Sequence, residues 1–498
     1  MSYLELLALI APETVVAIAA LVGLAVDLLF MREEPLKSRF LVTAAFACLG
    51  CGVAIAWLLL IQPPTSVNPM LALMFTADPL TRLVKVALLV LSICTILISL
   101  EGKFTEHVGE YLALILLATV GMMLMVSSTD LLMIFISLEL TSLSLYILTA
   151  FNKQNVKSVE AALKYFLFGG MSAAFTLFGL SLIYGLSGTT NLSQIAANLG
   201  GSKPLDPLLV MAIVMTVIGF GFKVAAVPFH LWAPDAYEGA PTPSAALIAS
   251  GSKLASFFIF AKVMMIGFAH AGGSGTWQDY SAGWLPAVAI VAAISMAVGN
   301  LAAIAQSNVK RLLAYSAIAH SGYALLGLLA NTSQGASSVV FYMATYGLTV
   351  VGAFAVVAVV EESAGGARLS DFAGLSRREP LVAFCMMIFM LSLAGVPPLA
   401  GFFGKFYLFV AAAGGAQNLG LLWLVIFAIA MSAISLYYYL QVLKQIYVVR
   451  PTASAEQMPI PASSRVIILA MAVGVVVFGC APNLLVGPLL ASIRAFGT

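Results

Sequence analysis

The chain has 498 residues, of which 62% are hydrophobic and only 9% are charged, and its mean hydropathy is +1.05. Soluble domains carry charge on roughly a quarter of their residues, so this composition excludes an ordinary soluble globule and indicates a membrane protein. The formal net charge is +2, and no basic cluster indicates binding to nucleic acid.

Apolar stretches long enough to cross a bilayer follow one another along the whole chain. A helix needs about 20 apolar residues to cross the hydrocarbon core. By this measure the sequence predicts an all-α polytopic membrane protein with fourteen spans, at 4–30, 40–61, 79–100, 110–127, 130–150, 159–186, 206–229, 241–268, 284–305, 310–330, 336–361, 380–411, 420–448 and 464–491.

The basic residues between these spans indicate an orientation. Thirteen lysines and arginines lie in or beside the odd-numbered loops, whereas the even-numbered loops hold only Lys203. The positive-inside rule therefore places the odd loops in the cytoplasm and both termini outside. Arg82 and Lys85, near the outer end of the third span, depart from this pattern, and the loop at 230–243 has no basic residue.

Five ionisable residues lie deep inside apolar spans: Glu139 in span five, Lys164 in span six, Lys223 in span seven, Lys253 in span eight and Lys405 in span twelve. A charge at the middle of a membrane costs roughly 2.5–3.5 kcal/mol on insertion scales, so such residues are paired, face water, or both. A chain that keeps this many of them is expected to move something charged.

Spans seven and twelve share a design, because each carries one lysine and is interrupted by glycine and proline. Lys223 and Lys405 lie 182 positions apart, and the same offset relates Glu139 to Ser321, Lys253 to Ser435 and Lys262 to Lys444. Spans four to eight and nine to thirteen are therefore predicted to be two copies of a five-helix unit. An odd number of helices makes the second copy insert inverted, and inverted repeats with broken helices are typical of ion-coupled transporters.

This repeat divides the chain into four predicted parts. They are an N-terminal three-helix segment at 1–109, a first antiporter-like repeat at 110–268, a second, inverted repeat at 284–448 and a C-terminal helix within 449–498.

The ionisable residues predict a proton path. Broken helices expose backbone groups that must face protein or water, so Lys223 and Lys405 are expected beside hydrated cavities. Glu139 is the only carboxylate that the sequence places deep in spans four to thirteen, and it should pair with Lys164 or Lys223. A lysine whose carboxylate partner turns away holds its proton less strongly.

Further residues are candidates for the same path. Lys253 and His230 would relay a proton toward the centre, Lys405 would stand on the exit side, and His320 is a second histidine relay. Ser142, Ser250, Ser252, Tyr437 and Tyr438 could bind water. Lys262 and Lys444 lie near helix ends, where a lysine can extend to the interface. In the competing interpretation, all these charges only lock helices together by pairing.

Three long motifs resemble one known family. They are VPFHLWAPDAYEGAPTP at 227–243, NVKRLLAYSAIAHSGY at 308–323 and GVPPLAGFFGK at 395–405. They are similar to the antiporter-like, proton-translocating subunits of respiratory complex I, NADH-quinone oxidoreductase. The wording DAYEGAP and the lysine in span twelve resemble the subunit N branch, the mitochondrial subunit 2 type, and the likeness covers essentially the whole chain.

This resemblance implies a proton path through Glu139, Lys164, Lys223, Lys253 and Lys405. It also implies a multi-pass protein of the bacterial inner (plasma) membrane, periplasmic at both termini, that assembles with the other membrane-arm subunits. NADH, FMN, iron–sulfur clusters and quinone are expected in partner subunits, with no cofactor or metal in this chain. The alternatives are a subunit of a multi-subunit cation/proton antiporter or of a membrane-bound hydrogenase, or a purely structural membrane scaffold.

Overall fold

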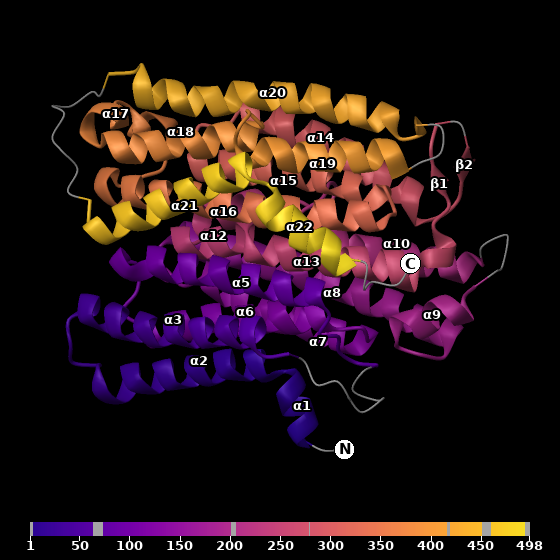
Figure 1. The fold of residues 1–498 in the computed structure, drawn as a ribbon. Helices are drawn as coiled ribbons and strands as arrows, with labels where there is room; N and C mark the ends of the chain where they lie inside the picture. The colour runs from indigo at the N-terminus through magenta and orange to yellow at the C-terminus, as the bar shows by residue number, and fades with distance from the viewer. Residues whose placement is uncertain are drawn as a thin grey trace.

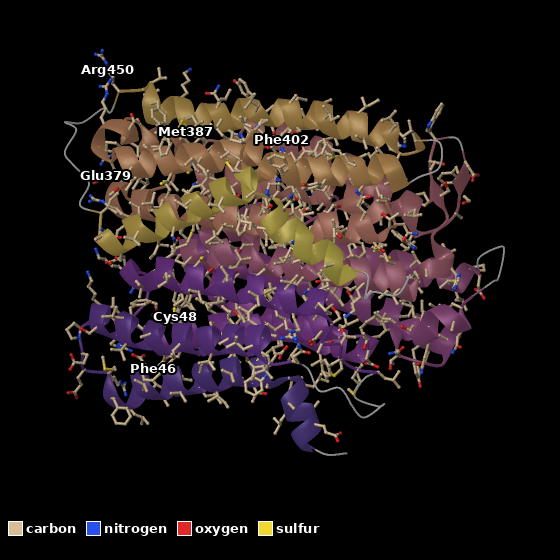
Figure 2. All side chains as sticks on the ribbon, viewed as in Figure 1. Phe46, Cys48, Glu379, Met387, Phe402 and Arg450 are labelled. Atoms are coloured by element: carbon tan, nitrogen blue, oxygen red, sulfur yellow. The ribbon has the colours of Figure 1, made fainter. Side chains whose placement is uncertain are left out.

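The protein is a bundle of helices that run side by side, with their connections gathered at two ends (Figure 1). The computed structural model describes residues 3–62, 73–200, 206–277, 279–415, 419–450 and 460–493. Figure 2 shows Glu379 and Arg450 at the left end of the bundle, where α17 lies, whereas α9 and the strands β1 and β2 lie at the right end in Figure 1.

Long helices follow one another along the described chain. The N-terminal segment holds α1 (Tyr3–Leu9), α2 (Ala11–Phe30), α3 (Leu36–Leu60), α5 (Pro79–Ile98) and the 3₁₀ turn η1 (Ser99–Glu101). The next part holds α6 (Val108–Ser127), α7 (Leu131–Thr149), α8 (Val156–Ser187), α9 (Leu192–Asn198), α10 (Pro207–Lys223), α11 (Trp232–Gly239), α12 (Thr242–Ala249), α13 (Gly251–Lys262), the π turn η2 (Val263–Gly267) and the 3₁₀ turn η3 (Ala269–Ala271).

A short antiparallel hairpin separates the two halves: β1 (Ser274–Gly275) pairs with β2 (Tyr280–Ser281), with Ser274 opposite Ser281. The second half holds α14 (Trp284–Ile304), α15 (Val309–Leu329), α16 (Ser333–Ala364), η4 (Leu369–Phe372), α17 (Leu375–Arg378), α18 (Pro380–Ala394), α19 (Ala400–Gly415) and α20 (Leu422–Tyr447). The described chain ends with α21 (Ala462–Cys480) and α22 (Asn483–Ile493).

The predicted fold class is confirmed, with changes at particular spans. Twelve of the described helices are long and apolar enough to cross a membrane. The two remaining predicted spans, 206–229 and 380–411, are broken helices whose segments are each shorter than a full crossing. The predicted spans 4–30, 241–268 and 464–491 are also divided, near Ile10, Ser250 and Ala481.

The segment 230–243, which the sequence predicted as a loop, is mostly helix α11. Pro234 lies in its first turn, where a missing N–H costs nothing. The broken helix of the first half therefore continues through Trp232–Gly239 before α12 begins at Thr242. Lys203, the basic residue predicted in an even loop, lies outside the described residues.

Local details of the two halves repeat at a nearly constant spacing. Asp130 caps α7 and Asn308 caps α15 through their side-chain oxygens, and each forms an isolated β-bridge, to Asn191 and to Arg368. The equivalent helices α8 and α16 both have 32 residues, and each ends at a glycine with positive φ, Gly188 or Gly365.

Gly188 and Gly365 are 177 positions apart, and Asp130 and Asn308 are 178 apart. The offset of 182 positions, which relates Lys223 to Lys405, therefore does not relate α7 to α15 or α8 to α16. It arises because Lys223 is the last residue of α10, before its break, whereas Lys405 lies in α19, after its break.

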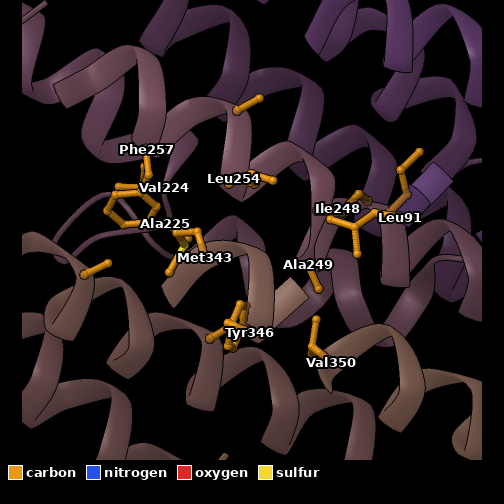
Figure 3. Packing of buried hydrophobic residues seen from close by; sticks show 14 of the residues in the cluster. Leu91, Val224, Ala225, Ile248, Ala249, Leu254, Phe257, Met343, Tyr346 and Val350 are labelled. Carbon is orange, nitrogen blue, oxygen red and sulfur yellow. The ribbon is translucent and has the colours of Figure 1, made fainter. Parts of the chain in front are cut away.

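The centre of the bundle is a continuous apolar core. Figure 3 shows part of it, where Leu91 of α5, Ile248 of α12, Leu254 of α13 and Val350 of α16 belong to one cluster. The helix α16 is mostly buried among its neighbours, whereas its equivalent α8 exposes most of its surface. The two equivalent helices therefore differ in position, because α8 lies at a side of the bundle and α16 in its interior.

Candidate functional site

The first part of the site is an ion pair between α7 and the end of α10. Lys223 Nζ lies 3.9 Å from Glu139 Oε1 and donates a hydrogen bond to the hydroxyl of Ser142. At 3.9 Å the two charges attract each other without sharing a hydrogen bond. Glu139 Oε1 is buried with no hydrogen-bond partner among the described residues. Of the two partners predicted for Glu139, the structure selects Lys223.

The break after Lys223 leaves backbone groups that helix bonds cannot satisfy, and side chains satisfy them instead. The hydroxyl of Ser295 accepts from Val227 N at 2.9 Å, and the indole of Trp232 donates to Phe222 O at 3.0 Å. The hydroxyl of Ser321 donates to Val224 O at 2.6 Å. Because buried backbone groups in a membrane protein must be satisfied internally, these three side chains hold the break open in one conformation.

Ser321 also connects the break to Lys253. Lys253 Nζ donates to Ser321 Oγ at 2.8 Å and to the carbonyl of Ala317, and only 1% of Lys253 is exposed. A single hydroxyl therefore lies between Lys253 and the residue that follows Lys223. Within the described chain Lys253 has no carboxylate partner at ion-pair distance, so its ammonium form is held by neutral groups.

His320 precedes Ser321 on α15 and faces a group of tyrosines. Its Nδ1 lies 2.6 Å from the hydroxyl of Tyr342, and its Nε2 lies 3.0 Å from that of Tyr439. The Tyr439 hydroxyl is also 2.6 Å from Ser316 Oγ. Tyr437, a candidate from the sequence, is 54% exposed, so Tyr439 and not Tyr437 turns toward the interior.

Lys405 lies at the second break. Its Nζ donates to Leu393 O and Ala394 O, each at 3.0 Å, and to Ser432 Oγ at 2.8 Å. The first two are carbonyls at the end of α18, where a helix carries partial negative charge and favours a cation. The same Nζ lies 5.1 Å from the ring centroid of Tyr323, which contacts His320 edge-on.

Lys164 is not brought to Glu139. It is 41% exposed in its side chain and pairs with Glu160 at 2.7 Å and with Asp235 at 2.9 Å. Together with His230, Asp235 and Arg311 it lines a cavity of about 630 Å³ at the side of the bundle. His230 Nδ1 is buried there without a hydrogen-bond partner in the described chain. Within the described residues, no hydrogen bond joins His230 to Lys253.

Sequence reasoning missed the carboxylates of α11. Asp235 lies 2.6 Å from Arg311, and Glu238 lies 2.9 Å from Lys157. Both carboxylates fall in the segment 230–243, which the sequence predicts as a loop. The run from Trp232 to Gly239, with two carboxylates three residues apart and a proline in the first turn, could have indicated a short helix.

The arrangement suits proton transfer more than binding of a cofactor. Beside the two breaks lie the buried lysines Lys223, Lys253 and Lys405, and each donates a hydrogen bond to a serine hydroxyl. The carboxylate of Glu139 and the imidazole of His320 lie near them. Within the described residues, no group of three or more His, Cys, Asp or Glu side chains could hold a metal ion. The groups present can take up and release protons.

Comparisons with known proteins agree on one family. Residues 128–435 match the family described as NADH:quinone oxidoreductase/Mrp antiporter, TM. NADH-quinone oxidoreductase subunit N 2 of Acidobacterium capsulatum is 50% identical over 493 residues, which are 97% of this chain and 98% of that protein.

Solved structures show the same fold. A chain of respiratory complex I from Thermus thermophilus has a TM-score of 0.78 and 32% identity, with 96% of this chain and 99% of that chain covered. A chain of the Mrp complex from Dietzia sp. has a TM-score of 0.81 at 21% identity over 99% and 97% of the two chains, which shows a common fold alone. The chain belongs to the NADH:quinone oxidoreductase/Mrp antiporter family of transmembrane proteins, and within it to the subunit N group of NADH-quinone oxidoreductase.

Proposed function

We propose that this membrane-arm subunit of a bacterial NADH-quinone oxidoreductase carries protons through Glu139, Lys223, Lys253 and Lys405, driven by electron transfer from NADH to quinone in partner subunits. The observation that carries the proposal is the contact between the two halves at Ser321. Its hydroxyl bonds both Lys253 Nζ and the carbonyl that follows Lys223. This hydroxyl holds the Lys253 ammonium beside the break that follows Lys223, so that Lys253 is positioned to accept a proton that leaves Lys223.

The charge balance supports a transfer in this direction. The attraction between Glu139 and Lys223 at 3.9 Å is about 4 kcal/mol at an effective dielectric constant of 20. Lys253 and Lys405 have only neutral partners at hydrogen-bond distance in the described chain. A proton is therefore loaded at the Glu139–Lys223 pair, and it passes on when Glu139 moves away from Lys223.

His320 and the tyrosine hydroxyls of Tyr342 and Tyr439 continue the route from Ser321 toward Lys405, which releases the proton on the exit side. Lys164 and His230 act earlier. Both line the side cavity with Asp235, where Lys164 can bind a proton from water and His230 has a free ring nitrogen.

The four predicted parts, 1–109, 110–268, 284–448 and 449–498, take separate roles in this proposal. The two repeats each hold one broken helix and one buried lysine beside it, whereas the terminal parts surround them. The protein lies in the bacterial inner (plasma) membrane with both termini periplasmic. A cavity of about 700 Å³, lined by Glu238, Lys310 and Glu361 among others, gives water access from the opposite, cytoplasmic end.

Assembly with the other membrane-arm subunits supplies the driving force. NADH, FMN, iron–sulfur clusters and quinone are bound by partner subunits, and this chain contributes the proton path. The likeness to the Mrp complex concerns the fold, and sodium-dependent proton flux in the absence of NADH and quinone would favour an antiporter instead.

The test is NADH-driven acidification of inverted membrane vesicles that carry Lys223→Met or Glu139→Gln in the assembled complex. Both changes keep side-chain size and remove a charge. We expect proton transport to fall by about a hundredfold or more, as for loss of a proton-transfer group. Wild-type transport with intact assembly would instead support the structural scaffold.

A further inference from the structure

A second group of buried charges lies outside this path, between the N-terminal segment and the first repeat. Glu13 of α2, Lys85 of α5 and Lys262 of α13 are 2%, 3% and 4% exposed. Lys85 Nζ lies 2.6 Å from Glu13 Oε1. Within the described residues no group other than Lys85 pairs with the carboxylate of Glu13. Burial of three charges is costly, and the path through Lys405 does not use them.

Lys262 is the least compensated of the three. It donates to Thr76 Oγ1 at 3.2 Å and to Val126 O at 3.3 Å, and it lies 5.9 Å from the ring centroid of Phe258. Among the described residues no carboxylate lies within 4 Å of its ammonium group. The prediction that Lys262 extends to the interface is wrong, because the chain continues past it through the π turn Val263–Gly267 and keeps its side chain inside.

The partners of Lys262 lead to the surface. Thr76 is partly exposed, and two residues later Asp78 is partly exposed as well. Asp78 caps α5 by accepting from Thr81 N and Thr81 Oγ1, each at 2.7 Å. It also lies within electrostatic range of Lys262. Thr81 is one helical turn before Lys85 on α5. Thr76, Asp78 and Thr81 therefore form a polar group beside the buried charges, and water can reach its carboxylate.

The polar group of Thr76, Asp78 and Thr81 lies at the end of the bundle opposite the cytoplasmic cavity. Thr76 N bonds Ser127 O, and Thr129 N bonds Met74 O. Leu192, the first residue of α9, bonds Thr129 O, and α9 lies at the right end in Figure 1. Lys262 and Lys253 share the helix α13, nine positions apart, which is about 13 Å along its axis. Lys262 is thus placed between the centre of the path and the outer end.

We propose that Lys262 and Asp78 form a second proton outlet, which branches from Lys253 and is attached to the first repeat. The inference rests on the proton path proposed above. The Lys262 ammonium gives its proton to the Asp78 carboxylate, which releases it to outer water, and neutral Lys262 regains a proton from the side of Lys253. The Glu13–Lys85 pair keeps the charge of Lys85 neutralised, so that Lys85 does not expel the proton from Lys262 too early.

The decisive variants keep structure and remove proton transfer. Lys262→Arg keeps the charge and the hydrogen-bond donors but cannot give up its proton. Asp78→Asn keeps a good helix cap but cannot be protonated. Lys444→Met, which removes an exposed lysine from α20, is the control for loss of a positive charge. Each is measured in the assembled complex as protons transported per NADH oxidised, in inverted vesicles.

If the two outlets carry equal shares, Lys262→Arg and Asp78→Asn each lower transport about twofold. Combining Lys262→Arg with Lys405→Met closes both outlets, so transport falls well below the roughly one quarter that two independent twofold losses would leave. The Lys444→Met control stays at the wild-type value.

Two results would overturn the inference. One is wild-type transport in both Lys262→Arg and Asp78→Asn, with a double variant no worse than Lys405→Met alone. The other is loss of transport in Lys262→Met that Lys262→Arg restores, since this would show a structural charge. Lys223→Met, measured alongside, separates the cases: if it is impaired while Lys262→Arg is not, the main path stands and only the branch fails.

Discussion

Replacing Ser321 by alanine tests the contact on which the path depends. The side chain is fully buried, and its Oγ lies 2.6 Å from Val224 O, 2.8 Å from Lys253 Nζ and 2.9 Å from Ala317 O. Alanine has nearly the same volume and is a better helix former, so α15 should fold as before. What is lost is the hydroxyl that links Lys253 to the main chain at the break after Lys223.

The size of the effect follows from the bonds removed. A hydrogen bond to a charged group contributes about 1.5–3 kcal/mol, and the carbonyl of Val224 also loses its donor. Since about 1.4 kcal/mol changes a rate tenfold, proton transport should fall about ten- to a hundredfold. Oxidation of NADH should fall with it if the two processes are tightly coupled.

The assay is NADH-driven acidification of inverted vesicles, normalised to the amount of assembled complex. Ser338→Ala is the matched control, because that hydroxyl is also buried but, within the described part of the chain, bonds only Gly335 O of its own helix, at 2.7 Å. A Ser321→Ala complex that pumps at the rate of Ser338→Ala would refute the idea that Ser321 connects Lys223 to Lys253.

Two further substitutions test the second half of the chain. Gly401→Ala would make a Cβ overlap with Ser392 O, so α19 could no longer lie against the end of α18. We therefore expect little assembled complex of this variant on native gels. The control is Gly414→Ala on the same helix, whose Cβ meets nothing within 4 Å and which should assemble normally. Tyr439→Phe removes the hydroxyl shared by His320 and Ser316 and should slow proton transport severalfold. Tyr437→Phe, on the exposed side, should not slow it, and equal effects of the two would exclude Tyr439 from the path.

Much of the architecture could be predicted because membrane spans depend on hydropathy alone. Length and apolarity placed the unbroken helices within a few residues, and the expense of buried charge singled out Lys223, Lys253 and Lys405 correctly as interior groups. The partner of Glu139 could not be decided between Lys164 and Lys223. Both lie in spans that follow that of Glu139, and only packing shows that Lys164 turns outward to Asp235.

Other features depend on contacts between distant segments. Lys85 looked like an exception to the positive-inside rule, because nothing in the sequence around it shows that Glu13, 72 positions earlier, is its partner. The sequence predicts the repeat but not its structural offset. Lys223 and Lys405 look alike in the sequence, yet Lys223 precedes its break and Lys405 follows its break. The connections between equivalent helices also differ in length.

The unequal burial of α8 and α16 has a consequence for how the sequences of the two repeats evolve. Both helices have 32 residues, about 48 Å of helix, which exceeds the hydrocarbon thickness of about 30 Å. On α8, large side chains such as Leu163, Phe166 and Met171 are at least half exposed. Replacing one of them by another apolar residue therefore leaves the packing nearly unchanged. On α16 a large-to-small replacement leaves a cavity that costs about 2–5 kcal/mol. Selection therefore acts mainly on hydropathy in α8 and on side-chain volume in α16. The two sequences can diverge while both helices keep their length and the glycine at their end.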